Sequence, residues 1–138
     1  MKPASLVTDN IAELLVKIVE FTQTRQKVLT RNINNLRSPG FIPCDLDVDE
    51  FSELLNCAVD EHLRAHRLLL RDTENIKFGP SGAFQVKPVP DDHAKKLLEH
   101  SPDQYIELQI NKLMQNSINQ RIATELLKQK QGAVSIFD

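Results

Sequence analysis

The chain has 138 residues, of which 41% are hydrophobic and 26% are charged, and its formal net charge is −2. This near-neutral balance lacks the basic footprint of a nucleic-acid-binding protein. Aromatic residues make up only 5% and the chain has four glycines, which excludes a sheet protein rich in tight turns. We therefore expect an all-α fold built by aliphatic packing of helix on helix.

No apolar run approaches the length of a membrane span, and the first residues lack the hydrophobic region of a signal peptide. We therefore expect no direct membrane insertion. The location is expected to be cytosolic, or to be reached by an export route that needs no cleaved signal.

The first helix is expected from about residue 10 to residue 36, after a flexible lead at residues 1–8. Asn10 and Glu13 have the spacing of a capping box. An apolar stripe at helical spacing follows: Ile11, Leu14, Leu15, Ile18, Phe21, Val28, Leu29, Ile33 and Leu36. The stripe is narrow, so this helix is expected to need a partner helix.

The first helix should stop abruptly near residue 36. Asn34 and Asn35 are poor helix-interior residues, and Pro39 biases the preceding Ser38 away from the helical region. Gly40 then allows a backbone turn that is open to few other residues. The segment therefore predicts a helix end followed by a sharp turn.

The middle of the chain predicts one acidic helix and a small hairpin. Asp47 and Glu50 have a capping spacing, and the apolar positions after them indicate a helix to about residue 71. Residues 76–78 and 83–86 flank a Gly-Pro-Ser-Gly turn, which favours a β-hairpin. A phosphate-binding loop is the alternative, but the Gly-Lys-Ser/Thr ending of a P-loop is absent. A short helix is expected at residues 91–99.

The last helix is expected from Ser101, as the cap, to about Gln131, with Gly132 as its stop. Pro102 fits the first turn, and Gln104 completes a capping box. Its apolar stripe comprises Ile106, Ile110, Leu113, Met114, Ile118, Ile122 and Leu126. The spacing is nearer four than three and a half residues, so the stripe drifts around the helix and suits packing against more than one neighbour.

We predict three segments, 1–37, 38–100 and 101–138. The two long terminal helices are expected to pack as an antiparallel coiled-coil-like hairpin, with the central segment as the excursion that joins them. Ile11, Leu15 and Ile18 of the first helix are expected to pack with the stripe of the last helix.

No catalytic, cofactor or metal motif is expected. His62 and His66 lie one helical turn apart, but the zincin pattern needs a Glu directly after the first His. The alternating Asp residues of 45–49 lack the Gly and distal Glu of a calcium loop. Cys44 and Cys57 leave a disulfide, a thiol pair or a metal site open; their separation fits no zinc spacing, and we interpret them as core or surface thiols.

Charge is uneven along the chain. Residues 1–43 carry six Lys/Arg and three Asp/Glu, residues 44–75 carry three and nine, and residues 76–138 carry eight and seven. The acidic middle segment is either a solvated face or a patch that matches a neighbouring subunit, since complementary patches fix register more than affinity.

Residues Arg25 to Phe41, which we name the turn segment, have a sequence similar to a known signature. Asn32-Ile33-Asn34-Asn35, two further residues, and Ser38-Pro39-Gly40-Phe41 resemble the Asn-Ile-Ala-Asn-x-x-Thr-Pro-Gly-Tyr/Phe signature of the bacterial flagellar basal-body rod protein family. The matching positions are Arg25, Gln26, Leu29, Asn32, Ile33, Asn35, Ser38 (for Thr), Pro39, Gly40 and Phe41. Asn34 replaces the family's Ala.

The resemblance covers roughly residues 10–55 and 103–131, and it is greatest to the proximal rod members. In the last helix it rests on Glu107, Ile110, Lys112, Leu113, Asn116, Ile118, Leu126, Leu127 and Lys130. The family's Gly-Asn-x-Val-Asp before this helix is replaced by residues 101–105.

The resemblance implies a structural, non-enzymatic subunit that self-assembles through its terminal helices into a tube that transmits torque and carries the export channel. It implies type III export, a periplasmic place in the basal body, and other rod proteins and export-gate components as partners. The alternative is a small helical adaptor or export chaperone that binds a partner helix.

Overall fold

The computed structural model describes residues 3–79 and 84–137, with side chains at 10–79 and 84–132. Within this part of the chain lie four helices: α1 (Pro3–Asn34), α2 (Val48–Ala65), α3 (Asp92–His100) and α4 (Pro102–Phe137). Four short strands lie in the central segment: β1 (Cys44–Asp45), β2 (Ile76–Phe78), β3 (Phe84–Val86) and β4 (Val89–Pro90). The expectation of a mostly helical fold is confirmed.

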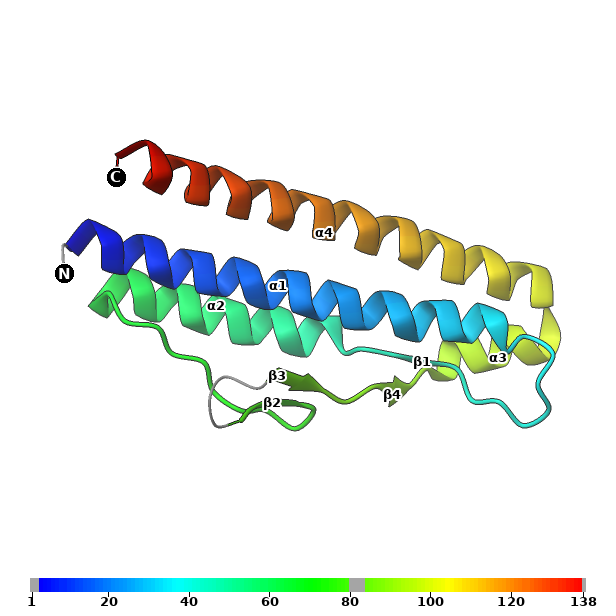
Figure 1. Ribbon diagram of the computed structural model, residues 1–138. Helices are drawn as coiled ribbons and strands as arrows, with labels where there is room; N and C mark the ends of the chain where they lie inside the picture. The colour runs from blue at the N-terminus through cyan, green and yellow to red at the C-terminus, as the bar shows by residue number, and fades with distance from the viewer. Residues whose placement is uncertain (1–2, 80–83, 138) are drawn as a thin grey trace.

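Helix α1 lies between α2 and α4, and the two chain termini lie at the same end of the molecule (Figure 1). Helix α4 follows α1 along most of its length and runs in the opposite direction (Figure 1). Helix α2 also runs opposite to α1, since its first turn meets Phe21 through Phe51 and its last turn meets Asn10 through His62.

The apolar core lies between α1, α2 and the β2–β3 hairpin. Phe21 and Phe51 stack with ring centroids 4.0 Å apart, and they form one cluster with Leu46, Leu54 and Ile76. Partly buried hydrophobic side chains from α1, α2, the hairpin and the segment between α2 and β2 pack around this cluster: Ile18, Val28, Leu55, Leu70, Phe78, Phe84 and Val86. The hydrophobic core is therefore built on the side of α1 that faces α2 and the hairpin.

The hairpin is confirmed as an antiparallel pair in which Ile76 faces Val86 and Phe78 faces Phe84. Residues 80–83, where the turn was expected, lie outside the described part of the chain. A second, unexpected pairing joins β1 to β4, with Cys44 opposite Pro90. This pairing fixes the segment that follows the turn to the segment that precedes α3.

Three helix boundaries differ from the sequence prediction. Helix α1 begins at Pro3, since Pro is tolerated in a first turn, so the expected lead is wrong. Asn10 is not a cap, because its amide lies within hydrogen-bonding distance, 3.3 Å, of both His62 Nδ1 and the His66 carbonyl. Helix α4 continues through Gly132 to Phe137, because one helical Gly costs only about 1 kcal/mol relative to Ala.

Helix α2 ends at Ala65 rather than near residue 71. His66 takes the left-handed conformation, with φ 55°, and its N–H donates to the His62 carbonyl at 2.9 Å. The expected start of α2 is correct, since the Asp47 carboxylate accepts from the Glu50 N–H at 3.0 Å. Glu50 does not complete a capping box, because its carboxylate accepts from the side chains of Thr73 and Asn75.

Candidate functional site

In the turn segment, side-chain hydrogen bonds cap the C-terminal end of α1, and a tight turn follows. Asn35 donates its side-chain N–H to the Arg31 carbonyl at 2.9 Å, and the Ser38 hydroxyl lies 3.1 Å from Asn35 Oδ1. The Phe41 N–H then donates to the Ser38 carbonyl at 3.2 Å, and Gly40 has φ +73°. Pro at the second and a positive-φ Gly at the third position fit a type II turn.

A prediction follows for Gly40. A Cβ at this position would meet nothing within 4 Å, so the cost of a substitution is the cost of the positive φ and not a clash. We expect Gly40→Val to lower the free energy of unfolding by about 2 kcal/mol, and Gly40→Asn by less than about 1 kcal/mol, because Asn tolerates the left-handed region. Urea unfolding measures both; equal losses in the two variants would contradict this explanation.

Arg25, the first residue of the turn segment, is buried and binds Asp45 in β1. Its Nε and Nη2 donate to the two carboxylate oxygens of Asp45 at 2.9 and 3.0 Å. Lys112 of α4 completes the group, with Nζ 2.9 Å from Asp45 and 2.8 Å from Asp91. We name these four residues the buried charge network; it connects α1, β1, the cap of α3 and α4.

The network changes the ionisation of its members. Burial alone raises the pKa of Asp45, but hydrogen bonds from Arg25 and Lys112 outweigh it, so the pKa of Asp45 is below its usual value. Burial alone lowers the pKa of Lys112, but hydrogen bonds to Asp91 and Asp45 raise it above its usual value. Asp45 and Lys112 therefore both remain charged at neutral pH.

Asn32 is the second buried polar residue of the turn segment, with 1% of its surface exposed. Its amide forms a strand-like pair with Cys44, donating to the Cys44 carbonyl at 2.7 Å and accepting from the Cys44 N–H at 3.2 Å. The same amide nitrogen also donates to Gln109 of α4 at 2.9 Å. Asn32 therefore holds β1 and α4 to α1 at one point.

Helix α4 meets α1 through polar side chains. Tyr105 donates its hydroxyl to the Asn32 carbonyl at 2.9 Å, and Asn116 donates its amide to the Thr22 carbonyl at 2.7 Å. Burial and the nearby Asp91 and Cys44 raise the pKa of Tyr105 to about 12, so its hydroxyl keeps the proton that it donates. We name this contact the polar seam; its members are Thr22, Asn32, Tyr105, Gln109 and Asn116.

Much of the apolar stripe predicted for α4 is left exposed by α1. Ile110, Met114, Ile118, Ile122 and Leu126 are 44–60% exposed, and we name them the outer row. Since a helix turns about 100° per residue, each step of four residues moves the row about 40° around α4. The row therefore starts on the face opposite the seam and winds back toward α1, so the expectation that the stripe packs with the first helix is wrong for Ile110, Met114 and Ile118.

The other residues of the predicted stripe are better covered. Leu15 is buried, and Ile11, Ile18, Ile106 and Leu113 are half-buried. Ile122 and Leu126, at the far end of the outer row, line a groove of about 260 Å³ together with Leu15, Ile18 and Phe21. The structure thus brings the two stripes together only at this groove.

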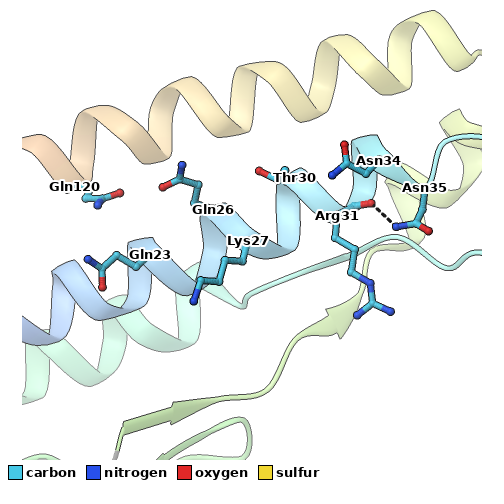
Figure 2. Close-up of a pocket in the computed structure, with 8 residues that line it drawn as sticks. All are labelled: Gln23, Gln26, Lys27, Thr30, Arg31, Asn34, Asn35 and Gln120. Carbon is cyan, nitrogen blue, oxygen red and sulfur yellow. Dashed lines mark hydrogen bonds between the residues drawn. The ribbon is translucent and has the colours of Figure 1, made fainter.

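The remaining turn-segment residues lie at different depths. Leu29 is completely buried, and Ile33, Asn35 and Phe41 are half-buried. Pro39 and Ser38 are exposed. Gln26 lines a hollow of about 730 Å³ on α1. Lys27 and Arg31 of α1 and Gln120 of α4 also line this hollow (Figure 2).

Sequence reasoning missed most of the partners that these residues bind. Asp45, Asp91, Tyr105, Gln109 and Lys112 were not predicted as members of a site. A signal was present in α4, where Tyr105, Gln109, Lys112 and Asn116 recur at i, i+4, i+7 and i+11. That spacing places one polar stripe on one face of a helix.

Among the described residues, no group of three or more His, Cys, Asp and Glu side chains is arranged to hold a metal ion. His62 is buried beside Asn10, and His66 caps α2. Cys44 and Cys57 are both free, and burial raises the pKa of the Cys44 thiol. The described helices include none with the length and apolarity that a membrane crossing needs.

Comparison of the chain with models of known families, with curated proteins and with solved structures finds no match.

Proposed function

We propose that this protein is a structural subunit of the bacterial flagellar basal-body rod, self-assembling through its two long helices into a tube. In this proposal α1 and α4 act as one antiparallel coiled-coil-like hairpin, and the assembly transmits torque and surrounds the export channel. The subunit reaches the periplasmic rod by type III export, and its neighbours are further copies, other rod proteins and components of the export gate. It binds no nucleic acid and carries out no catalysis.

The observation that carries this proposal is the outer row of α4. Five large apolar side chains lie exposed along a 36-residue helix, and the first three of them, Ile110, Met114 and Ile118, lie on the face that points away from the seam. Contiguous exposed apolar side chains of this kind are typical of protein interaction sites. A long helix whose intramolecular contact is polar and whose apolar row faces outward is suited to packing against another subunit.

The turn segment supports the same proposal. The positions that resemble the rod-family signature include the two buried polar residues that hold α4 and β1 to α1, Arg25 and Asn32. They also include Gly40, whose positive φ is a conformation that glycine adopts without steric cost. The resemblance therefore lies on residues with definite structural roles.

Self-association of the purified protein tests the proposal. We expect sedimentation velocity to show large assemblies that grow with protein concentration. Ile118→Glu should raise the concentration needed for assembly at least about tenfold, because it places a charge in the apolar row. Ser117→Glu is the matched control, since Ser117 is exposed on the same turn outside the row, and it should assemble normally.

The alternative is a small helical adaptor or export chaperone, which the groove between α1, α2 and α4 favours. This groove is lined by Leu15, Phe21, Phe51 and Leu126, and an amphipathic partner helix could dock its apolar side chains there. A protein that stays monomeric at all concentrations, and whose Ser117→Glu and Ile118→Glu variants behave alike, would favour this function over the rod subunit.

A further inference from the structure

Helix α2 carries a stripe of exposed carboxylates. Asp49, Glu53 and Asp60 are all exposed and follow each other at i, i+4 and i+11. At about 100° per residue these three positions fall within roughly 40° of each other on the helix, over a length of about 16 Å. We name these residues the acidic stripe.

Helix α1 carries a surface of the opposite character. Lys27 and Arg31 lie one turn apart and extend to the same side of α1 (Figure 2). The hollow that they line is otherwise surrounded by amide and hydroxyl side chains, including Gln23, Thr30 and Asn34. None of its described lining residues is acidic. We name Lys27 and Arg31 the basic stripe; these two cations lie about 6 Å apart along the helix axis, within a polar hollow that extends over about 16 Å, from Gln23 to Asn34.

The two stripes do not neutralise each other within one chain. Throughout residues 10–79 and 84–132, the ion pairs involve other carboxylates, namely Glu13, Glu20, Asp45, Glu61, Asp91 and Glu125. Lys27 and Arg31 take part in none of them. Each stripe is therefore available to another molecule.

We propose that the acidic stripe of one copy docks on the basic stripe of the next copy. A second copy is the occupant because this chain itself carries the complementary stripe, of opposite charge and set in a polar hollow about as long as the acidic stripe. The two surfaces are different, so the contact is head-to-tail and can repeat without closing, as a filament or tube requires. This inference rests on the proposed self-assembly and assigns its orientation, since opposed charges fix register and suppress wrong pairings.

Charge reversal tests the contact. Lys27→Glu with Arg31→Glu, and separately Glu53→Lys with Asp60→Lys, should each raise the concentration needed for assembly at least about tenfold, because like charges then face each other. Lys95→Glu with Lys96→Glu is the matched control: both lysines are exposed on α3, and the charge change equals that of the first variant. This control should assemble like the wild type. Circular dichroism shows that each variant remains folded.

Mixing gives the decisive result. Each of the two reversed variants alone should need at least about tenfold more protein to assemble, but an equimolar mixture should assemble within about threefold of the wild-type concentration, because both kinds of contact are again attractive. If the mixture stays dissociated, or if either reversed variant alone assembles like the wild type, this contact is wrong.

The two proposals fail differently. Wild-type protein that never assembles refutes the self-assembly and this contact together. Wild-type protein that assembles and is blocked by Ile118→Glu, but not by charge reversal, leaves the rod proposal standing and refutes only the contact between stripes. Binding of the basic stripe to an unrelated acidic protein, with no rescue in the mixture, also refutes it.

Discussion

Replacement of Asp45 by alanine is expected to lower the free energy of unfolding by about 3–5 kcal/mol. The substitution leaves Arg25, whose side chain is only 11% exposed, without its carboxylate partner, whereas Lys112 loses Asp45 but keeps Asp91. An unpaired buried charge costs more than the pair contributes when intact. The loss should be read from urea unfolding at pH 7.

The effect of Asp45 should depend on pH in one direction. Its pKa in the folded protein is lowered, so the stability that it contributes is present above the unfolded pKa of about 3.9 and is lost as pH falls through the folded pKa. The difference in stability between wild type and Asp45→Ala should therefore be largest near neutrality and shrink below about pH 4. Asp49→Ala is the control, because Asp49 is exposed. A loss below about 1 kcal/mol for Asp45→Ala would refute the role of the network.

Asn32→Ala is expected to cost about 3 kcal/mol, the second largest effect. It removes one side chain that hydrogen-bonds both backbone groups of Cys44 and the Gln109 amide. Each buried polar group left without a hydrogen-bond partner lowers the free energy of unfolding by about 1–3 kcal/mol. The expected total stays near about 3 kcal/mol because water can reach some of these groups after truncation.

Asn34→Ala is the matched control for Asn32, at an exposed position two residues away in the same helix. It should leave stability unchanged or raise it slightly, because Ala has the higher helix propensity. Thermal melting of both variants, followed by circular dichroism, compares them directly. If the two variants melt together, Asn32 does not hold β1 and α4 as we describe.

Sequence signals were sufficient to predict those parts of the fold that depend on a few adjacent residues. The cap at Asp47, the β2–β3 hairpin and the turn at Gly40 each follow from a few adjacent residues. The end of α2 was missed because Leu68, Leu69 and Leu70 continue an apolar pattern, although the helix has already stopped at His66. Apolar spacing alone does not distinguish a helix from a chain that folds back onto the core.

The site itself could not be derived from spacing, because its partners are far apart in sequence. Asn32 and Gln109 are 77 residues apart, and Arg25 and Asp45 are 20 apart. The family resemblance singled out Arg25 and Asn32, but only the fold explains why those two positions are polar and buried. The antiparallel direction of α4 was predicted, but the face that it turns to α1 was not, because we assigned the apolar stripe to this contact, whereas hydrogen bonds make most of it.

The polar seam has a mechanical consequence. Asn32 with Gln109, Tyr105 with the Asn32 carbonyl, and Asn116 with the Thr22 carbonyl form directional bonds at fixed heights along α1 and α4. A shear force along the helix axes loads all of these bonds at once, and a slip of one helical turn breaks every one of them. A force that peels α4 away from its free end meets them one after another. The pair of helices therefore resists sliding far more than it resists peeling.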